Sequence, residues 1–146
     1  MEPRLNFYKA SPKAIKAMRG VEEQIGRSSL ERPLIELVRL RASQINGCAF
    51  CVDMHATDAR KAGESERRLA AVTVWNEAPF FSDRERAALE WTEALTRVEQ
   101  THVPEDVWQR VKPFFTPEEL VDLTLLVGAI NTWNRFAIAF RSQLPA

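Results

Sequence analysis

Both cysteines of the chain and one of its two histidines lie in the stretch NGCAFCVDMH, residues 46–55. Cys48 and Cys51 are three positions apart, close enough to pair as a disulfide at the start of a helix, as in other C-x-x-C motifs. His55 follows Cys51 by four positions, and residues at that spacing share one face of a helix. A base one turn away and the positive end of a helix dipole both favour the thiolate form of Cys51. The stretch therefore predicts thiol redox chemistry, with a metal site, a structural disulfide or coincidence as alternatives.

A carboxylate on the preceding predicted helix can complete this constellation. Glu36 lies ten residues before position 46, about 15 Å along a helix, and His55 lies eight residues after position 47, about 12 Å. If the two helices pack antiparallel across the turn at 46–47, Glu36 and His55 reach similar heights, and the carboxylate can orient the imidazole and raise its basicity. We therefore expect Glu36, His55 and Cys51 to share one cleft. The alternative is that Glu36 only pairs with a neighbouring arginine such as Arg39.

Other interpretations of the cysteine pair fit less well. A structural zinc site needs four ligands, and only carboxylates and His102, in a predicted loop far along the chain, remain to supply them. Attachment of a c-type haem needs a histidine directly after the second cysteine, where this chain has Val52. A thioredoxin-like fold needs βαβ units, and the sequence shows no alternating strand pattern of any length.

Capping signals divide the chain into helices that would position these residues. Ser11 and Thr116 each stand directly before a proline at a first helical position, and Ser82 with Glu85 forms a capping-box pattern. The Asn-Gly pair at 46–47 is a helix stop. The predicted helices cover about residues 12–25, 31–46, 48–62, 65–74, 82–98, 104–115 and 117–141. The sequence therefore predicts an all-α fold, a single-domain helical bundle of about six to eight helices spanning residues 1–146.

Composition limits the class of protein. The 146 residues are 45% hydrophobic and 27% charged, as in ordinary globular proteins, and 20 basic residues balance 20 acidic ones. Without a basic excess, no nucleic-acid partner is expected. The N-terminus MEPRLNFYKA resembles no secretory signal, so a cytoplasmic location is the default expectation, and thiols there are normally kept reduced.

The most apolar segment, residues 120–140, also contains polar and charged side chains, which argues against a membrane span. These side chains are Asp122, Asn131, Asn134 and Arg135. We expect the two asparagines to satisfy buried helix or subunit contacts. Apolar residues point in several directions around this helix, more than one contact face needs. Together with a net charge of zero, this predicts a homo-oligomer with closed symmetry.

Taken together, these residues resemble a known family. Glu36, Cys48, Cys51 and His55 match the E-x11-C-x2-C-x3-H signature of the AhpD-like alkylhydroperoxidases, within the carboxymuconolactone decarboxylase superfamily. The segments RASQINGCAFCVDMHATDARKAG, FSDRERAALEWTEALT and NTWNRFAIAFR are also typical of that family. The resemblance extends over about residues 10–142.

The resemblance implies an all-helical protein that assembles into trimers or hexamers and runs a peroxidase reaction. In it, Cys51 corresponds to the peroxidatic cysteine and Cys48 to the resolving one, while His55 and Glu36 correspond to a proton relay. The best-studied members carry a histidine directly before the second cysteine, and this chain has Phe50 there, so its relay is one member short. The decarboxylase branch lacks the cysteine pair, which argues against lactone decarboxylation.

The leading hypothesis is a thiol-dependent peroxidase that reduces organic hydroperoxides without a metal, haem or flavin. The Cys51 thiolate would attack the peroxide, Cys48 would form a disulfide with the resulting sulfenic acid, and an external dithiol, thioredoxin-like or lipoyl, would reduce that disulfide. Two alternatives remain: a general dithiol–disulfide oxidoreductase and a non-enzymatic redox-sensing helical oligomer. The expected partners are a hydroperoxide, the reductant and further copies of the chain, as a homotrimer or homohexamer, with no membrane.

Overall fold

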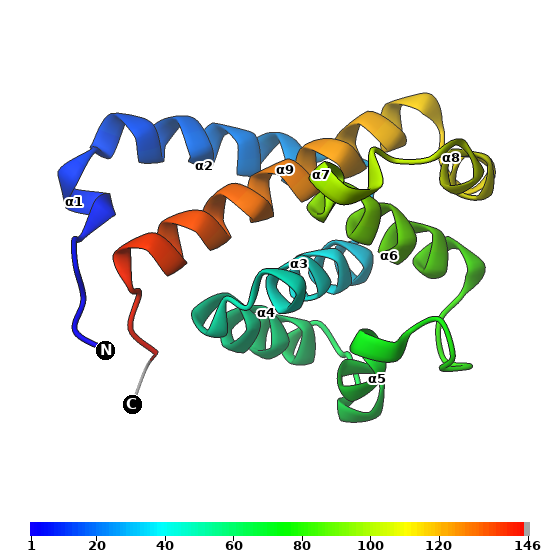
Figure 1. Cartoon of the computed structure of the whole chain (residues 1–146), viewed down its shortest axis with the longest axis horizontal. Helices are drawn as coiled ribbons and strands as arrows, with labels where there is room; N and C mark the ends of the chain where they lie inside the picture. The colour runs from blue at the N-terminus through cyan, green and yellow to red at the C-terminus, as the bar shows by residue number, and fades with distance from the viewer. Residues whose placement is uncertain (145–146) are drawn as a thin grey trace.

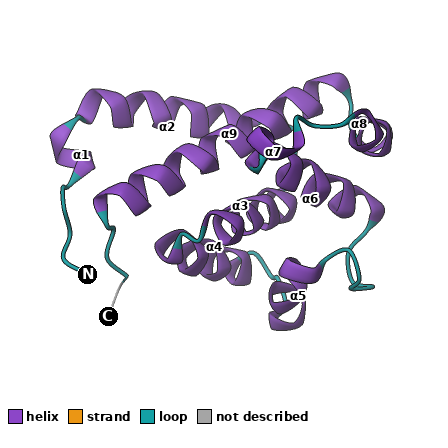
Figure 2. Ribbon diagram, in the orientation of Figure 1, coloured by secondary structure: helices purple, strands orange, loops and turns teal. Residues whose placement is uncertain are grey.

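The computed structural model of the chain describes residues 1–144, so Pro145 and Ala146, the last two residues of the expected domain, lie outside the described residues. Within 1–144 the secondary structure is entirely helical, without a strand (Figure 2), which confirms the predicted all-α fold. The α-helices in chain order are α1 (Phe7–Ala10), α2 (Pro12–Arg27), α3 (Arg32–Asn46), α4 (Ala49–Lys61), α5 (Glu66–Ala71), α6 (Asp83–Thr96), α7 (Val98–Thr101), α8 (Glu105–Val111) and α9 (Pro117–Phe140). Two short 3₁₀ helices follow α5 and α8, namely η1 (Val72–Val74) and η2 (Lys112–Phe114).

The predicted caps begin the longer helices. Ser82 and Thr116 both form complete capping boxes, in which the hydroxyl accepts a hydrogen bond from the backbone N–H of Glu85 or Glu119 and that glutamate accepts one from the N–H of the cap. Ser11 makes no side-chain cap hydrogen bond, so the proline that follows it begins α2 through its fixed backbone angle alone. Local chemistry therefore explains where α6 and α9 start.

Two helices of the structure lie beyond the predicted ones, α1 and α7, each of four residues. A helix that short cannot display the 3.6-residue period on which the prediction rests. The side chain of Asn6 caps α1, which buries Phe7, and His102 ends α7 with a left-handed backbone, φ 48°. These turns are held by their neighbours rather than by their own sequence pattern.

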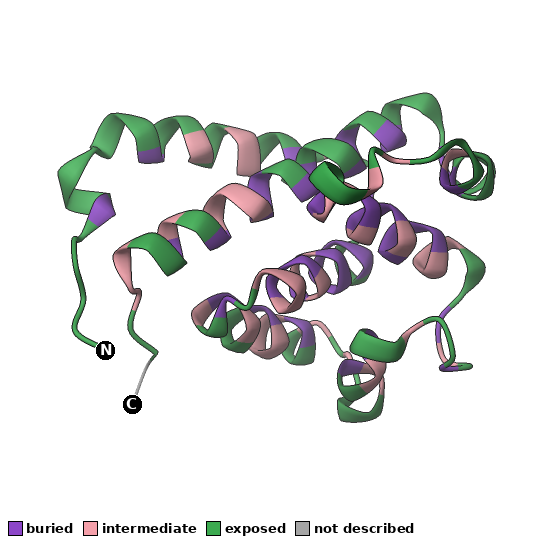
Figure 3. Ribbon diagram, in the orientation of Figure 1, coloured by how far each residue is buried: buried purple, intermediate pink, exposed green. Residues whose placement is uncertain are grey.

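Helix α3 forms the centre of the molecule and packs against α4, α6 and α9. Leu37 and Val38 are completely buried on it. In Figure 3 the buried positions concentrate on α3 and α6, while much of the outer surface of α2 is exposed. One apolar cluster joins α3 to α2, α6, α8 and α9, and a second joins it to α4, α5 and η1. Packing on several sides therefore holds α3 in place, and with it the backbone of Glu36.

Helix α9 runs diagonally across the molecule in Figure 1. Leu123 and Leu126 are completely buried along its inner side. Apolar side chains remain in water elsewhere on it, with Val121 at 68% and Ile138 at 46% exposure. No helix within residues 1–144 combines the length and apolarity that crossing a membrane requires. A single chain therefore leaves part of the apolar surface of α9 uncovered.

Candidate redox site

The cysteine pair sits where the turn between α3 and α4 ends. Gly47 ends α3 in the left-handed region, φ 67°, where a side chain would be strained. Cys48 is the N-cap of α4, and its Sγ accepts a hydrogen bond from the backbone N–H of Cys51 at 3.3 Å. A disulfide joins the two cysteines, whose Cα atoms are 5.3 Å apart, and each residue is 2% exposed. The start of the helix therefore holds both sulfurs in a buried setting, with the Cys48 sulfur next to the backbone N–H of Cys51.

An amide network fixes this turn against α9. Asn46 donates to the side-chain oxygens of Asn131 and Asn134, at 3.0 and 2.8 Å. Asn134 is fully buried and donates in turn to Ser43 Oγ at 3.0 Å, while the backbone oxygen of Ser43 accepts from the N–H of Cys48. The expectation of a buried helix contact is confirmed for Asn134, whereas Asn131 is only partly buried. Their contacts join the turn before α4 to α9.

His55 and Glu36 meet across the packed pair α3 and α4, with 3.1 Å between His55 Nδ1 and Glu36 Oε2. Burial alone would raise the pKa of Glu36, but the hydrogen bond to His55 and the charge of Arg39 outweigh it, so the pKa lies below its ordinary value. An ionised carboxylate only accepts hydrogen bonds, so Nδ1 of His55 carries the proton. In the neutral imidazole, Nε2 is then the basic nitrogen.

The network continues behind Glu36. Arg39 Nη1 donates to Glu36 Oε1 at 2.9 Å, and its Nη2 pairs with Glu22 on α2. Trp133 on α9 donates from Nε1 to Glu22 Oε1 at 2.9 Å. The pairing of Glu36 with an arginine was considered from the sequence as an alternative to a relay, and the structure shows both contacts on one carboxylate. Glu22 was missed because no local spacing links α2 to this site.

A cavity of about 290 Å³, the His55 cavity, lies in front of this network. Cys51 and His55 line it, together with Glu22, Arg39 and Asp58, whereas Glu36 stands behind His55 and does not line it. The expectation of one shared cleft therefore holds for Cys51 and His55 only, because α3 presents Glu36 to the imidazole rather than to the opening. The rest of the wall is largely apolar, formed by Phe7, Tyr8, Phe50, Met54, Ile130, Trp133 and Ala137.

Phe50 and Met54, which flank the second cysteine, both line the His55 cavity, and Met54 is 38% exposed. Phe50 packs against both cysteines and Ala137 in a small apolar cluster. The wall residues from α1 and α9 were not found from the sequence, because they come from segments far from the motif.

Cys48 does not open into the His55 cavity. It lines a separate space of about 380 Å³, which shares Phe50 and Ala137 with the His55 cavity. The largest apolar cavity, about 1000 Å³ between α2, α6, α8 and α9, contains no cysteine or histidine, and its one ionisable lining residue is Lys112 among the residues described. Among the cavities described, the two cysteines therefore line only the His55 cavity and the second space of about 380 Å³.

One cluster of side chains has the composition of a metal site. The ligand atoms of Glu36, His55 and Asp58 lie within 4.8 Å of one another. Both oxygens of Glu36 already have partners, however, and one of these partners is the guanidinium of Arg39. A positive charge at that position opposes a cation, so the arrangement fits proton transfer better than metal binding.

Comparison with known proteins extends this picture. The family described as "Carboxymuconolactone decarboxylase family" matches residues 10–94. A solved structure from Agrobacterium tumefaciens, a protein of unknown function described as a candidate antioxidant defence protein AhpD, is 46% identical, covers 99% of each chain and superposes with a TM-score of 0.96. The uncharacterized protein YdfG of Bacillus subtilis is 43% identical over 98% of this chain and 97% of its own.

A more distant structure shares the fold. An uncharacterized peroxidase-related protein from Silicibacter is 21% identical, covers 90% of this chain and 70% of its own, and superposes with a TM-score of 0.80. At that identity the likeness shows the fold alone. The similarity to the Agrobacterium and Bacillus proteins, by contrast, runs nearly from end to end.

Proposed function

The chain is an AhpD-like member of the carboxymuconolactone decarboxylase family, and from that premise we propose that it is a thiol-dependent peroxidase that reduces organic hydroperoxides with Cys48 and Cys51. One observation carries the proposal: Cys51 and His55 line one cavity, and Glu36 contacts His55 through Nδ1. That contact leaves Nε2 as the basic nitrogen of a histidine beside a reactive sulfur. The description of the Agrobacterium relative as a candidate antioxidant defence protein supports the same function.

The first step uses the reduced protein. His55 Nε2 takes the proton of the Cys51 thiol, and the thiolate attacks the terminal oxygen of ROOH. The O–O bond breaks, an S–O bond forms, and the leaving alkoxide takes a proton from the imidazolium. The products are ROH and a sulfenic acid on Cys51, so the sulfur is oxidised and the peroxide reduced.

The second step returns the pair to the disulfide seen in the structure. The Cys48 thiolate attacks the sulfur of the Cys51 sulfenic acid, an S–S bond forms, and hydroxide leaves as water after protonation. The 5.3 Å between the Cα atoms allows this bond without movement of the helix. An external dithiol then reduces the disulfide by exchange and completes the cycle.

The cavity favours an apolar peroxide. Aromatic and apolar side chains from α1, α4 and α9 form most of the wall around Cys51, and the polar groups gather at the relay. An uncharged organic hydroperoxide can place its alkyl part against that wall while its O–O group reaches the sulfur. Hydrogen peroxide would gain none of the apolar contacts, so we expect it to react more slowly.

Stopped-flow oxidation of the reduced protein by a panel of hydroperoxides, followed by loss of free thiol, tests the proposal. We expect rapid loss of two thiols per chain with organic hydroperoxides and catalytic peroxide consumption once a dithiol is supplied. Turnover of disulfides without peroxide consumption would instead indicate a general oxidoreductase. Disulfide formation that reshapes an oligomer without turnover would indicate a redox sensor.

Assembly belongs to the same proposal. Two exposed apolar residues of α9, Val121 and Leu125, border the large apolar cavity between α2, α6, α8 and α9. A second copy of the chain could cover this surface, and the net charge of zero offers little repulsion. We expect a homotrimer or a homohexamer, and a single monomeric species in analytical ultracentrifugation at micromolar concentration would contradict this.

A further inference from the structure

The two sulfurs of the disulfide open into different spaces. Cys51 lines the His55 cavity, whereas Cys48 lines the second space, which we name the Cys48 cavity. The Cys48 cavity is bounded by Met1, by residues 47–50 at the start of α4, by Ala137, Ile138 and Arg141 at the end of α9, and by residues 142–144 that follow. Phe50 and Ala137 line both spaces and stand between them. The peroxide and the reductant of the proposed cycle could therefore reach the cysteine pair through different cavities.

The charges of the two cavities differ. The His55 cavity contains the carboxylates of Glu22 and Asp58 against the guanidinium of Arg39. The Cys48 cavity contains Arg141 and, among the described residues that line it, no carboxylate. A hydroperoxide is neutral and is indifferent to this contrast. The nucleophile that reduces a disulfide is a thiolate, and an anion approaches more readily beside Arg141 than past Glu22 and Asp58.

We infer that the external reductant enters the Cys48 cavity and attacks Cys48, an inference that rests on the proposed peroxidase cycle. The reductant thiolate bonds to Cys48 Sγ, the bond between Cys48 and Cys51 breaks, and its electron pair leaves on Cys51 as a thiolate. The second thiol of the reductant, deprotonated, then attacks its own sulfur in the mixed disulfide and releases the Cys48 thiolate. The reductant is oxidised to a disulfide and the protein regains two reduced cysteines.

This direction of attack releases Cys51 where the next reaction needs it. Both cysteines lie at the start of α4, but only Cys51 shares a cavity with His55, whose imidazole can stabilise a released thiolate as its ion-pair partner. A better stabilised thiolate is a better leaving group in exchange. Attack on Cys51 would instead place the bulky mixed disulfide in the peroxide cavity and release Cys48 away from the histidine.

The space selects the kind of dithiol. Cys48 is 2% exposed, so its sulfur is reached only by a group that enters the cavity. Three small residues, Gly47, Ala49 and Ala137, form part of the wall, and Phe50 is the one aromatic residue among the described lining residues. A dithiol on a slender, largely apolar chain fits such a space, whereas a dithiol on the surface of a folded protein is held outside it. Dithiothreitol is a suitable probe for the slender class.

A crossed pair of variants tests the two approaches. Ala49 lines only the Cys48 cavity and Met54 only the His55 cavity, and both are solvent-exposed positions on α4. We expect Ala49→Trp to slow reduction of the disulfide by dithiothreitol at least about tenfold and to leave oxidation by cumene hydroperoxide within about twofold. Met54→Trp should show the reverse. Slower reduction in Met54→Trp, or equal effects of both variants on reduction, would overturn the inference.

The reduction arm does not depend on peroxide chemistry, because the disulfide can be formed beforehand with diamide. If no hydroperoxide oxidises the reduced protein, the proposed function fails while the site of reductant attack is still decided. Ile138→Trp, which also borders only the Cys48 cavity, replaces Ala49→Trp if that variant does not fold.

The attacked sulfur can also be identified in the unaltered protein. The oxidised chain is mixed briefly with 2-mercaptoethanol, quenched with acid and treated with a maleimide, and fragment-ion mass spectrometry then locates each adduct. We expect mercaptoethanol on Cys48 and maleimide on Cys51. Mercaptoethanol on Cys51, or equal amounts on the two cysteines, would overturn the inference.

Discussion

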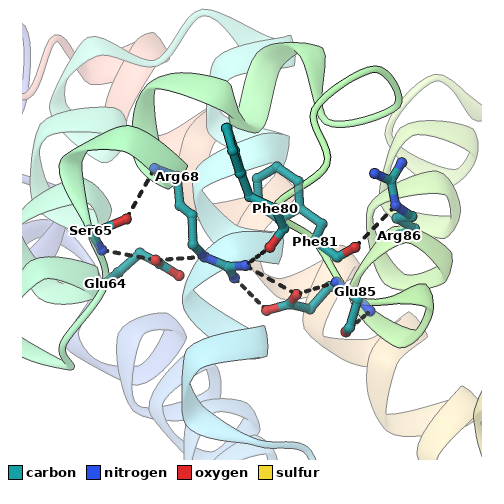
Figure 4. A network of polar contacts seen from close by, with 8 residues as sticks. Glu64, Ser65, Arg68, Phe80, Phe81, Glu85 and Arg86 are labelled. Carbon is teal, nitrogen blue, oxygen red and sulfur yellow. Dashed lines mark hydrogen bonds and ion pairs between the residues drawn. The ribbon is translucent and has the colours of Figure 1, made fainter.

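Two networks in this molecule pair an arginine with glutamates. Only one of them also includes a histidine that lines the cavity with Cys51. The site network consists of Glu22, Glu36, Arg39 and His55. The α5–α6 network, drawn in Figure 4, consists of Glu64, Arg68, Phe80 and Glu85. In each, one partly buried arginine lies between two glutamates from different segments.

In the α5–α6 network the charged groups pair with one another and with a backbone oxygen. Arg68 pairs with Glu64 at 2.7 Å and Glu85 at 2.5 Å and donates to the backbone oxygen of Phe80. Burial alone would lower the pKa of Arg68, but its hydrogen bonds to the two glutamates raise it. Glu85 also closes the capping box of Ser82. This network holds the loop between η1 and α6, and it contains neither a histidine nor a cysteine.

The site network ends on an imidazole instead. Glu36 occupies Nδ1 of His55, and the other face of that histidine borders the cavity that contains Cys51. The comparison teaches that paired charges alone do not indicate a function. What distinguishes the site is an imidazole whose Nδ1 is paired with Glu36 and which lines the same cavity as Cys51.

The largest expected effect comes from removing that ring. We expect His55→Gln to lower the rate constant for oxidation of the reduced protein by an organic hydroperoxide by about 10²–10⁴-fold, the usual contribution of a general base. Arg68→Met, in the other network, should change it by less than about twofold. Stopped-flow thiol loss measures both, and a His55→Gln rate within tenfold of the parent would remove the histidine from the mechanism.

Arg39→Met should shift the pH profile of the same reaction. Arg39 lowers the pKa of Glu36 by its charge and hydrogen bond, against burial, which raises it. Without the arginine the pKa of Glu36 rises, so the ionised form that orients His55 is lost at a higher pH. We expect the acidic limb to move up by about one pH unit or more. Glu22→Gln, which leaves the pairing of Arg39 with Glu36 in place, should move it less.

Arg68→Met, which we expect to leave the oxidation rate almost unchanged, should have a clear effect on the stability of the fold. Arg68→Met removes a partly buried cation from two carboxylates, and we expect a loss of about 2–3 kcal/mol in the free energy of unfolding, measured with urea. Arg67→Met is the matched control, because the exposed Arg67 only stacks on the ring of Phe80. Its loss should be under about 1 kcal/mol. Equal losses in the two variants would mean that the network does not stabilise the loop.

The smallest effect concerns a third pair, Arg84 and Glu119, which joins α6 to the start of α9. The hydrogen bond from Arg84 and then that from the Thr116 backbone lower the pKa of Glu119 from 4.5 to about 2. A carboxyl with a lowered pKa stabilises the fold fully above its unfolded pKa, and this stabilisation is lost as pH falls through about 2. We expect Glu119→Gln to flatten the fall in stability between about pH 4.5 and 2. An unchanged slope in acid titrations of unfolding would contradict this.

Much of the fold follows from short-range rules. Helix caps at Ser82 and Thr116, and the glycine stop at position 47, involve neighbouring residues and are visible in the sequence. Helical arithmetic also brings Glu36 level with His55, since both lie on helices joined by one tight turn. Their roles in catalysis stay predictions.

The remaining part of the site depends on contacts between distant segments. Glu22 reaches Arg39 from α2, and Trp133 reaches Glu22 from α9, across sequence separations that no periodic pattern encodes. The division of the cysteines between two cavities likewise depends on where the end of α9 and the residues after it lie. Local sequence therefore predicts the reactive residues, whereas tertiary packing decides what surrounds them.

In the proposed cycle, Cys51, on the histidine side of the disulfide, is the sulfur that reacts with peroxide. The most direct measurement is mass spectrometry of Cys48→Ser and Cys51→Ser after one equivalent of an organic hydroperoxide, with dimedone present to trap sulfenic acid. We predict a trapped sulfenic acid on Cys51 in Cys48→Ser and no rapid oxidation of Cys51→Ser. Rapid oxidation of Cys48 in Cys51→Ser, with an inert Cys51 in Cys48→Ser, would contradict the account and reverse the roles of the two cysteines.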